Sequence, residues 1–128
     1  MLSAEGDKNG VTWDRSVLYA FRGVFAAALT DRVFDNFLKY TRTRLLGEHV
    51  PYAVEAWPEG NMRHLSAESA LYCRIVIEGL FGLQSTGFGK FDVKAHLPKG
   101  IERMTLKNIN VYGRKISITV DKTGVHCN

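Results

Sequence analysis

The sequence predicts an α+β fold, in which helices come first and a small antiparallel sheet follows. In the earlier part of the chain, apolar residues recur at the three- and four-residue spacing of amphipathic helices. Near the C-terminus the pattern changes to the alternation of half-buried strands. Helices followed by strands are typical of α+β proteins. We therefore expect a loose segment over residues 1–12, a helical part over residues 13–85 and a C-terminal β domain over residues 86–128.

Two amphipathic helices are predicted in the first part of the chain. One begins at Asp14, and the other begins at Thr30 or Asp31 and has a natural stop at Gly47. The short connection between them predicts an antiparallel helical hairpin with an aromatic core. The residues at helical spacing are Val17, Phe21, Val24, Phe25 and Leu29 in the first helix and Phe34, Phe37, Leu38, Thr41 and Leu45 in the second.

A third helix is predicted to begin at Ser66, a residue type that caps helix N-termini. Glu68 lies in its first turn, where the helix dipole favours a negative charge. Arg74 and Glu78 are one turn apart and are expected to pair. The helix is so apolar that we expect it to be buried on most sides, with Cys73 packed as a small apolar side chain. A chain of 128 residues has little else to cover such a helix, which indicates missing partners.

The C-terminal part predicts three strands, over residues 91–97, 104–112 and 114–120, with turns at Gly113 and Gly124. The third strand alternates cleanly between apolar and polar residues. Its buried face is expected to consist of Ile116, Ile118 and Val120.

The composition is that of an ordinary globular chain, with 45% hydrophobic and 23% charged residues. The net charge is +4, but the Lys and Arg residues are scattered singly, so no nucleic-acid partner is predicted. No apolar run has the length of a membrane span, and the first residues lack the apolar centre of a signal peptide. No membrane partner is therefore predicted, and localisation stays open.

No metal or cofactor is implied by the sequence. Two cysteines define no disulfide framework. The glycine-rich stretch GLFGLQSTGFG precedes a predicted strand rather than a helix, so it lacks the context of a phosphate-binding loop. The histidines are dispersed without the spacing of metal ligands, at His49, His64, His96 and His126.

The stretch that is richest in chemistry runs from residue 54 to residue 64. Glu55 and Glu59 flank Trp57, and glycoside cleavage uses two carboxyl groups on either side of the scissile bond. The aromatic face of Trp57 would pack against the apolar face of a sugar ring. Each of these residues alone is more typical of a solvated or capping side chain, and only their combination favours a sugar site. The further candidates for binding sugar hydroxyls are Asn61, Arg63 and His64.

Three successive segments, VEAW, NMRHLSAESALYCRIVIEGLFGL and STGFGKFDVKAHLP, resemble the end of a six-hairpin glycosidase of the bacterial α-L-rhamnosidase-like kind. Such enzymes show a Trp-Glu-x-Trp type segment, a histidine-led helix, a Gly-Leu turn, then Gly-Phe and a strand ending in proline. The resemblance covers about residues 14–120, and Val54 stands where that pattern has tryptophan. The residues that carry it are Glu55, Trp57, His64, Gly82, Leu83, Gly87, Phe88 and Pro98.

The resemblance implies a toroid of paired helices followed by a β-sandwich. Six hairpins need on the order of 350 residues, so this chain would hold only the end of the toroid and the start of the sandwich. Carried over by residue, it implies that Glu55 is the general base of an inverting-type glycoside hydrolase acting on a carbohydrate substrate. Trp57 would line the sugar subsite and His64 would lie at the rim of the cleft. The general acid would lie in the rest of the parent chain, so this chain alone is expected to be inactive.

Two other interpretations stay open. The chain is alternatively a free-standing carbohydrate-binding or self-associating interaction module without catalysis, in which self-association covers the apolar helix faces. The third interpretation is a nonfunctional remnant of a broken gene, stable only together with other pieces. The sequence does not determine which sugar or linkage is bound, nor whether hydrolysis inverts or retains the anomer.

Overall fold

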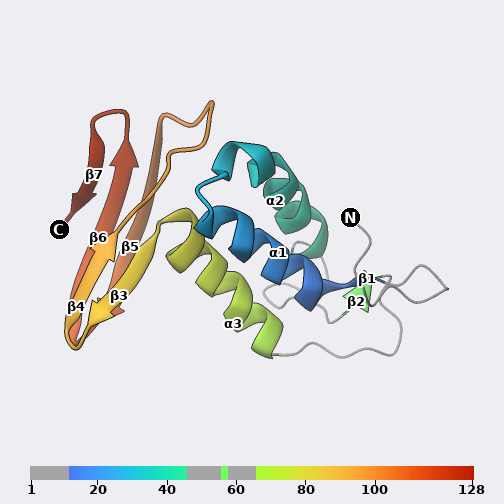
Figure 1. Ribbon diagram of the computed structural model, residues 1–128, viewed down its shortest axis with the longest axis horizontal. Helices are drawn as coiled ribbons and strands as arrows, with labels where there is room; N and C mark the ends of the chain where they lie inside the picture. Colours follow the sequence, from blue (N-terminus) through green and yellow to red (C-terminus); the bar gives the residue numbers. More distant parts are fainter. Residues whose placement is uncertain (1–11, 46–55, 58–65) are drawn as a thin grey trace.

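The computed structural model describes residues 12–45, 56–57 and 66–128, and it confirms the predicted α+β class (Figure 1). A layer of helices packs against one side of a pair of antiparallel sheets. The helices are α1 (Asp14–Ala26), α2 (Thr30–Arg44) and α3 (Ser66–Arg74), and α3 continues without a break into the π-helix η1 (Ile75–Leu80).

Helix α1 lies between α2 and α3 and runs antiparallel to α2, as the hairpin pattern predicts. The ring of Phe21 meets the rings of Phe37 and Tyr40 edge to face, at centroid distances of 5.5 and 5.7 Å. Phe25 contacts Phe37 in the same way at 5.4 Å. Burying each such ring contributes roughly 1.5–3 kcal/mol to folding. The predicted stripe is wrong at Leu29, which lies in the connection after α1 and is exposed.

Helix α3 and η1 run parallel to α1 on its other side, so that both ends of α1 are tied to them by ion pairs. Arg15, in the first turn of α1, pairs with Glu68. Arg22, near the C-terminal end of α1, pairs with Glu78. Tyr72 of α3 also stacks on Phe37 of α2, but a strip of α3 that includes Cys73 and Arg74 stays exposed, so this helix is less buried than predicted. Cys73, expected to pack inside, is exposed.

The winding of η1 was not predicted. From Ile75 onwards the backbone bonds between residues five apart, and the Phe81 N–H donates to the carbonyl of Val76 at 2.9 Å. A π-helix is rare, and it widens the helix locally. It brings Gly79 against Phe25, where a β-carbon would lie only 3.1 Å from the Phe25 side chain. The absence of a side chain at Gly79 therefore allows the close packing of η1 on α1.

The strands form separate antiparallel sheets among the described residues. Strands β3 (Leu83–Gly87) and β4 (Lys90–Val93) form one hairpin. A three-stranded sheet contains β5 (Arg103–Val111), β6 (Arg114–Asp121) and β7 (Gly124–Cys127), in that order. The predicted strand over 91–97 is shorter than expected, and β3 was not predicted. The turns at Gly113 and Gly124 are confirmed.

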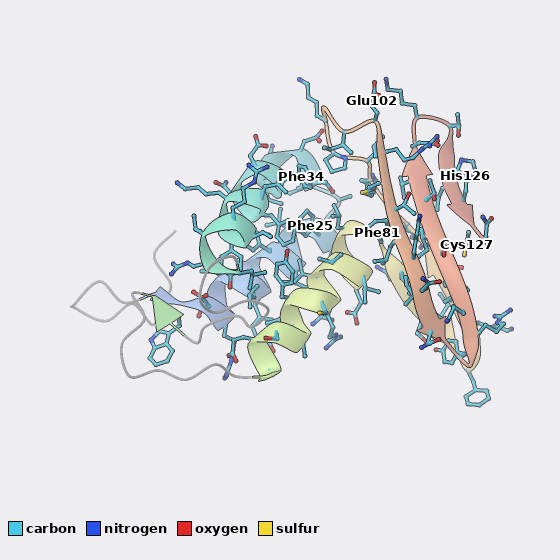
Figure 2. All side chains as sticks on the ribbon, turned by 180° about the vertical axis from the view of Figure 1, so that it is seen from behind. Phe25, Phe34, Phe81, Glu102, His126 and Cys127 are labelled. Atoms are coloured by element: carbon cyan, nitrogen blue, oxygen red, sulfur yellow. The ribbon has the colours of Figure 1, made fainter. Side chains whose placement is uncertain are left out.

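The helices and sheets share one hydrophobic core. The predicted buried face of β6 is confirmed, with Ile116, Ile118 and Val120 all buried. Phe81 lies between the helical layer and the sheet, whereas Glu102 and His126 lie at the outer end and edge of the sheet (Figure 2). The core therefore continues from the aromatic rings of the helical hairpin to the inner face of β6.

A tight backbone contact joins the end of η1 to the first hairpin. Gly82 has a φ of 61°, and its carbonyl accepts a hydrogen bond from the Lys94 N–H at 2.9 Å. A β-carbon at this position would lie 2.1 Å from the Lys94 carbonyl oxygen. Only glycine suits both the left-handed backbone and the close approach.

We expect Gly82→Ala to lower the free energy of unfolding by about 3 kcal/mol, because it adds a backbone clash to left-handed strain. Urea denaturation followed by circular dichroism measures this. Gly113→Ala is the matched control: its φ of 75° is also left-handed, but no atom lies within 4 Å of the added carbon. That variant should lose only about 1 kcal/mol, and equal losses would contradict the steric argument.

Candidate functional site

A group of charged and polar side chains around two buried carboxylates lies where the N-terminal ends of α1 and α3 meet the C-terminal end of α2. We call it the helix-end cluster. The antiparallel hairpin brings the last turns of α2 to the first turn of α1, and the parallel packing of α3 adds its own first turn. The side chains of the two carboxylates are fully buried. Its members are Asp14, Arg15, Tyr40, Arg44 and Glu68.

Asp14 is held by two side chains of α2. The Tyr40 hydroxyl donates a hydrogen bond to Asp14 Oδ2 at 3.0 Å, and Arg44 Nη2 lies 4.0 Å from Asp14 Oδ1. Asp14 Oδ1 accepts no hydrogen bond from any described residue. A buried carboxylate oxygen is costly to leave without a donor, so this atom has capacity for one more proton or hydrogen-bond donor.

Glu68 is held from the solvent side. Arg15 directs both Nε and Nη2 at Glu68 Oε1, each at 2.7 Å, while about half of the Arg15 side chain stays exposed. The second carboxylate oxygen, Glu68 Oε2, is buried and accepts no hydrogen bond from the described residues. Glu68, predicted to act with the helix dipole, is therefore also the buried partner of an ion pair between two helices.

Burial raises the pKa of Asp14, while the charge of Arg44 and the hydrogen bond from Tyr40 lower it, and the nearby charge of Glu68 raises it. Burial also raises the pKa of Tyr40, and the negative charge of Asp14 adds to that effect. The pKa of the Arg44 guanidinium is lowered, chiefly by burial. Tyr40 thus remains a neutral donor, and Asp14 is biased towards holding a proton. Such a carboxyl can give or accept a proton near its own oxygen atoms.

Two residues of the predicted sugar-site stretch, Ala56 and Trp57, pair with the residues that directly precede the helix-end cluster. Strand β1 (Thr12–Trp13) pairs with β2 (Ala56–Trp57), with Thr12 opposite Trp57 and Trp13 opposite Ala56. The backbone at Trp57 therefore lies beside the residues that lead directly into Asp14 and α1. The other predicted site residues lie outside the described residues: Glu55, Glu59, Asn61, Arg63 and His64.

Sequence reasoning missed Asp14, Tyr40 and Arg44 as members of a site. The available signal was weak: Tyr40 and Arg44 are four residues apart, so they share one helix face, and Asp14 is the first residue of α1. The sequence does not show that this face of α2 packs against the start of α1.

A second polar site lies at the other end of α1. A cleft of about 410 Å³ is lined by α1, η1 and β3. Arg74 donates to both oxygens of Glu78, at 2.7 and 2.9 Å, which confirms the predicted pair, and Arg22 donates to Glu78 at 3.1 Å. Hydrogen bonds from Arg74 lower the pKa of Glu78, opposed by partial burial and assisted by the charges of both arginines. Two guanidinium groups thus face the cleft around a single carboxylate.

No family model, curated protein or solved structure matches this chain. The function is therefore argued from the residues and their placement. Within the part of the chain that the structure describes, no group of three or more His, Cys, Asp or Glu side chains could hold a metal ion. None of the described helices is long and apolar enough to cross a membrane.

The raised pKa of Asp14 predicts a pH dependence of stability. Between its ordinary and its raised pKa, the folded protein holds a proton that the unfolded chain has released, so stability falls as pH rises through this window. We expect Asp14→Asn to remove that fall, so the variant gains stability relative to the wild type from pH 4 towards pH 7, as measured by urea denaturation. Asp121→Asn is a control of opposite sign, because hydrogen bonds from Thr123 lower the pKa of Asp121. A constant difference between Asp14→Asn and the wild type would contradict the expectation.

Tyr40→Phe should lower the free energy of unfolding by about 1–3 kcal/mol, because it leaves a buried carboxyl oxygen of Asp14 without its hydrogen-bond donor. It should also raise the pKa of Asp14 further, since the hydrogen bond from Tyr40 lowers it. Tyr72→Phe is the matched control: its hydroxyl bonds to the neutral Thr41 hydroxyl at 2.8 Å, so the loss should be smaller. Equal losses in the two variants would contradict a special role of the buried carboxyl of Asp14 in this hydrogen bond.

Proposed function

We propose that this chain is the carboxy-terminal portion of a glycoside hydrolase that resembles the six-hairpin, α-L-rhamnosidase-like enzymes. Glu55 acts as the general base and Trp57 lines the sugar subsite. The observation that carries the proposal is the pairing of β1 with β2, which places the Trp57 backbone beside the helix-end cluster. A general base and an aromatic sugar platform need a rigid support, and the buried ends of three helices provide one.

The arrangement of the helices supports the proposal. Helix α1 runs antiparallel to α2 and parallel to α3, the alternation that a ring of successive helical hairpins requires. The sheet of β5, β6 and β7 follows the helices, in the order that the resemblance implies. The exposed face of α3, which carries Cys73, is the type of surface that a neighbouring hairpin of the parent chain would cover.

The chemistry follows from the proposed roles. Glu55 removes a proton from the water that attacks the anomeric carbon, while the ring of Trp57 supports the sugar. Glu59, Asn61, Arg63 and His64 bind hydroxyl groups around it. The general acid that protonates the leaving oxygen belongs to the rest of the parent chain, so the 128-residue chain alone hydrolyses no glycoside.

We expect Glu55→Gln, made in the extended reading frame upstream of Met1, to lower kcat about 10²- to 10⁴-fold with a small change in KM. A general base contributes rate rather than affinity for the sugar. The measurement is the release of nitrophenol from nitrophenyl glycosides, with nitrophenyl α-L-rhamnoside tested first.

Glu102→Gln is the matched control, since Glu102 is an exposed carboxylate at the far end of the sheet. It should leave kcat unchanged. Normal turnover of Glu55→Gln would remove Glu55 from the mechanism. Hydrolysis by the 128-residue chain alone, abolished by Glu55→Gln, would show that no outside general acid is needed.

The second candidate is a carbohydrate-binding or self-associating module without catalysis. Exposed aromatic rings on the sheet favour it, in particular Phe88, whose side chain is fully exposed at a hairpin turn, and Tyr112. Sedimentation velocity over a hundredfold concentration range separates the self-associating form, whose size grows with concentration, from a monomer. An upstream stop codon directly before Met1 would favour this module over the hydrolase.

A further inference from the structure

The two hairpin turns of the sheets are joined into one unit. The Tyr112 hydroxyl hydrogen-bonds with the Ser85 hydroxyl and donates to the Gly87 carbonyl at 3.2 Å. The Arg114 guanidinium lies over the Phe91 ring, 5.9 Å from its centre. In Figure 1 both turns lie together at the lower end of the strands. We define the hairpin tip as residues 85–91 and 110–115, because the pairs Ser85–Phe91 and Asn110–Lys115 close the two turns.

The hairpin tip carries positive charge only. Its charged residues are Lys90, Arg114 and Lys115, and it contains no Asp or Glu. All three side chains are exposed. Elsewhere along the sheets the charges are mixed: Lys122 pairs with Glu102, and Arg103 with Asp121, at the opposite end. Asp92 lies two residues after Lys90 on the same exposed face of β4, so the tip and its border hold three cations against one carboxylate, and the potential there is positive.

Two aromatic rings of the hairpin tip face solvent. Phe88 has a relative exposure of 102%, and Tyr112 of 48%. Phe88 lies in the turn between β3 and β4, where a polar residue or glycine would serve the fold equally well. A fully exposed phenylalanine contributes nothing to the core, whereas an exposed aromatic face can stack on the flat face of a ligand.

The surface next to the hairpin tip is hollowed. A cleft of about 350 Å³ is lined by residues of the tip, including Phe91 and Tyr112, and by Glu78 of η1. It shares Glu78, Leu83 and Ser85 with the 410 Å³ cleft beside α1. Both volumes lie in the usual range of ligand sites, about 300–1,000 Å³. The negative charge of Glu78 is offset by Arg22 and Arg74, which both pair with it, so it repels an anionic ligand in this cleft only weakly.

We propose that the hairpin tip binds an acidic polysaccharide, a polymer of sugar rings that carry carboxylates. The exposed rings stack on the apolar faces of the sugars, and the cations pair with the carboxylates. A nucleic-acid duplex presents a charge about every 1.7 Å of its axis, a much denser row than three cations can match. A polymer with one carboxylate per sugar fits three cations interleaved with two rings. The inference rests on the proposed carbohydrate function for its choice of ligand class and names the substrate class of that function.

Polygalacturonate is the probe, and affinity electrophoresis of the 128-residue chain in gels with and without it measures binding. We expect Phe88→Ser to weaken binding about tenfold through the loss of one stacking face. Lys90→Gln combined with Lys115→Gln should weaken it at least as much. The double variant should also lose most of the salt dependence between 20 and 200 mM NaCl, since screening acts on the removed charges.

Two control variants match these changes elsewhere on the surface. Tyr19→Ser removes an aromatic residue of α1 that is also largely exposed, and Lys39→Gln removes an exposed cation of α2. Both should bind as the wild type does. Circular dichroism confirms that each variant is folded, and Phe88→Leu serves as a second variant that keeps an apolar side chain without the aromatic face.

Loss of binding in the tip variants alone supports the inference. It is overturned if the wild type does not bind polygalacturonate, if the tip variants bind like the controls, or if neutral amylose or single-stranded DNA is bound more tightly. None of these outcomes bears on catalysis, because the role of Glu55 is decided separately by turnover of the extended protein.

Discussion

The structure depends on the burial of α1 between two other helices. Leu18, Phe21 and Phe25 occupy one continuous apolar strip, and all three are buried. The rings of α2 contact this strip edge to face, and the glycine of η1 allows the third helix to approach it closely. Because α1 cannot be buried by one neighbour alone, the chain must return after α2 and run alongside it a second time. The sheet is then attached to the end of that second pass.

Charged side chains mark both ends of α1, and they do so in different ways. At one end, the carboxylates of Asp14 and Glu68 are fully buried, and Arg15 covers Glu68 from the solvent side. At the other end, Glu78 is partly exposed and its two arginine partners open onto the clefts beside the sheets. The closed end suits positioning and proton transfer, whereas the open end suits the binding of an anionic ligand. The backbone of Ala56 and Trp57 lies beside the first end, and the hairpin tip lies beyond the second.

Local patterns in the sequence predict the elements of this fold well. The starts of α1 at Asp14 and of α2 at Thr30 follow from apolar spacing and capping residues, and the buried face of β6 follows from its alternation. Strand β3 escaped prediction because LQSTG has no alternating apolar residues. The exposure of Cys73 depends on which face of α3 is covered, which no local pattern records.

The candidate site is less predictable than the fold. Asp14 and Tyr40 are 26 residues apart, and Arg15 and Glu68 are 53 apart, so their contacts arise only when the helices pack. The pair of Arg74 and Glu78 was predictable because it lies within one helix turn. Of the sugar-site stretch, the structure describes only Ala56 and Trp57, and only through their pairing with β1.

The π-helix η1 has a geometric consequence for the whole molecule. Successive residues of an α-helix are rotated by about 100° around its axis, and a π turn accommodates an extra residue with less rotation for each one. Every atom after Ile75 is therefore set at a different azimuth from the one that ordinary winding would give. Because Gly82 and the sheets follow immediately, this offset is passed to them as a rigid rotation. The π winding of η1 thus contributes to the direction in which the β layer faces relative to the helices.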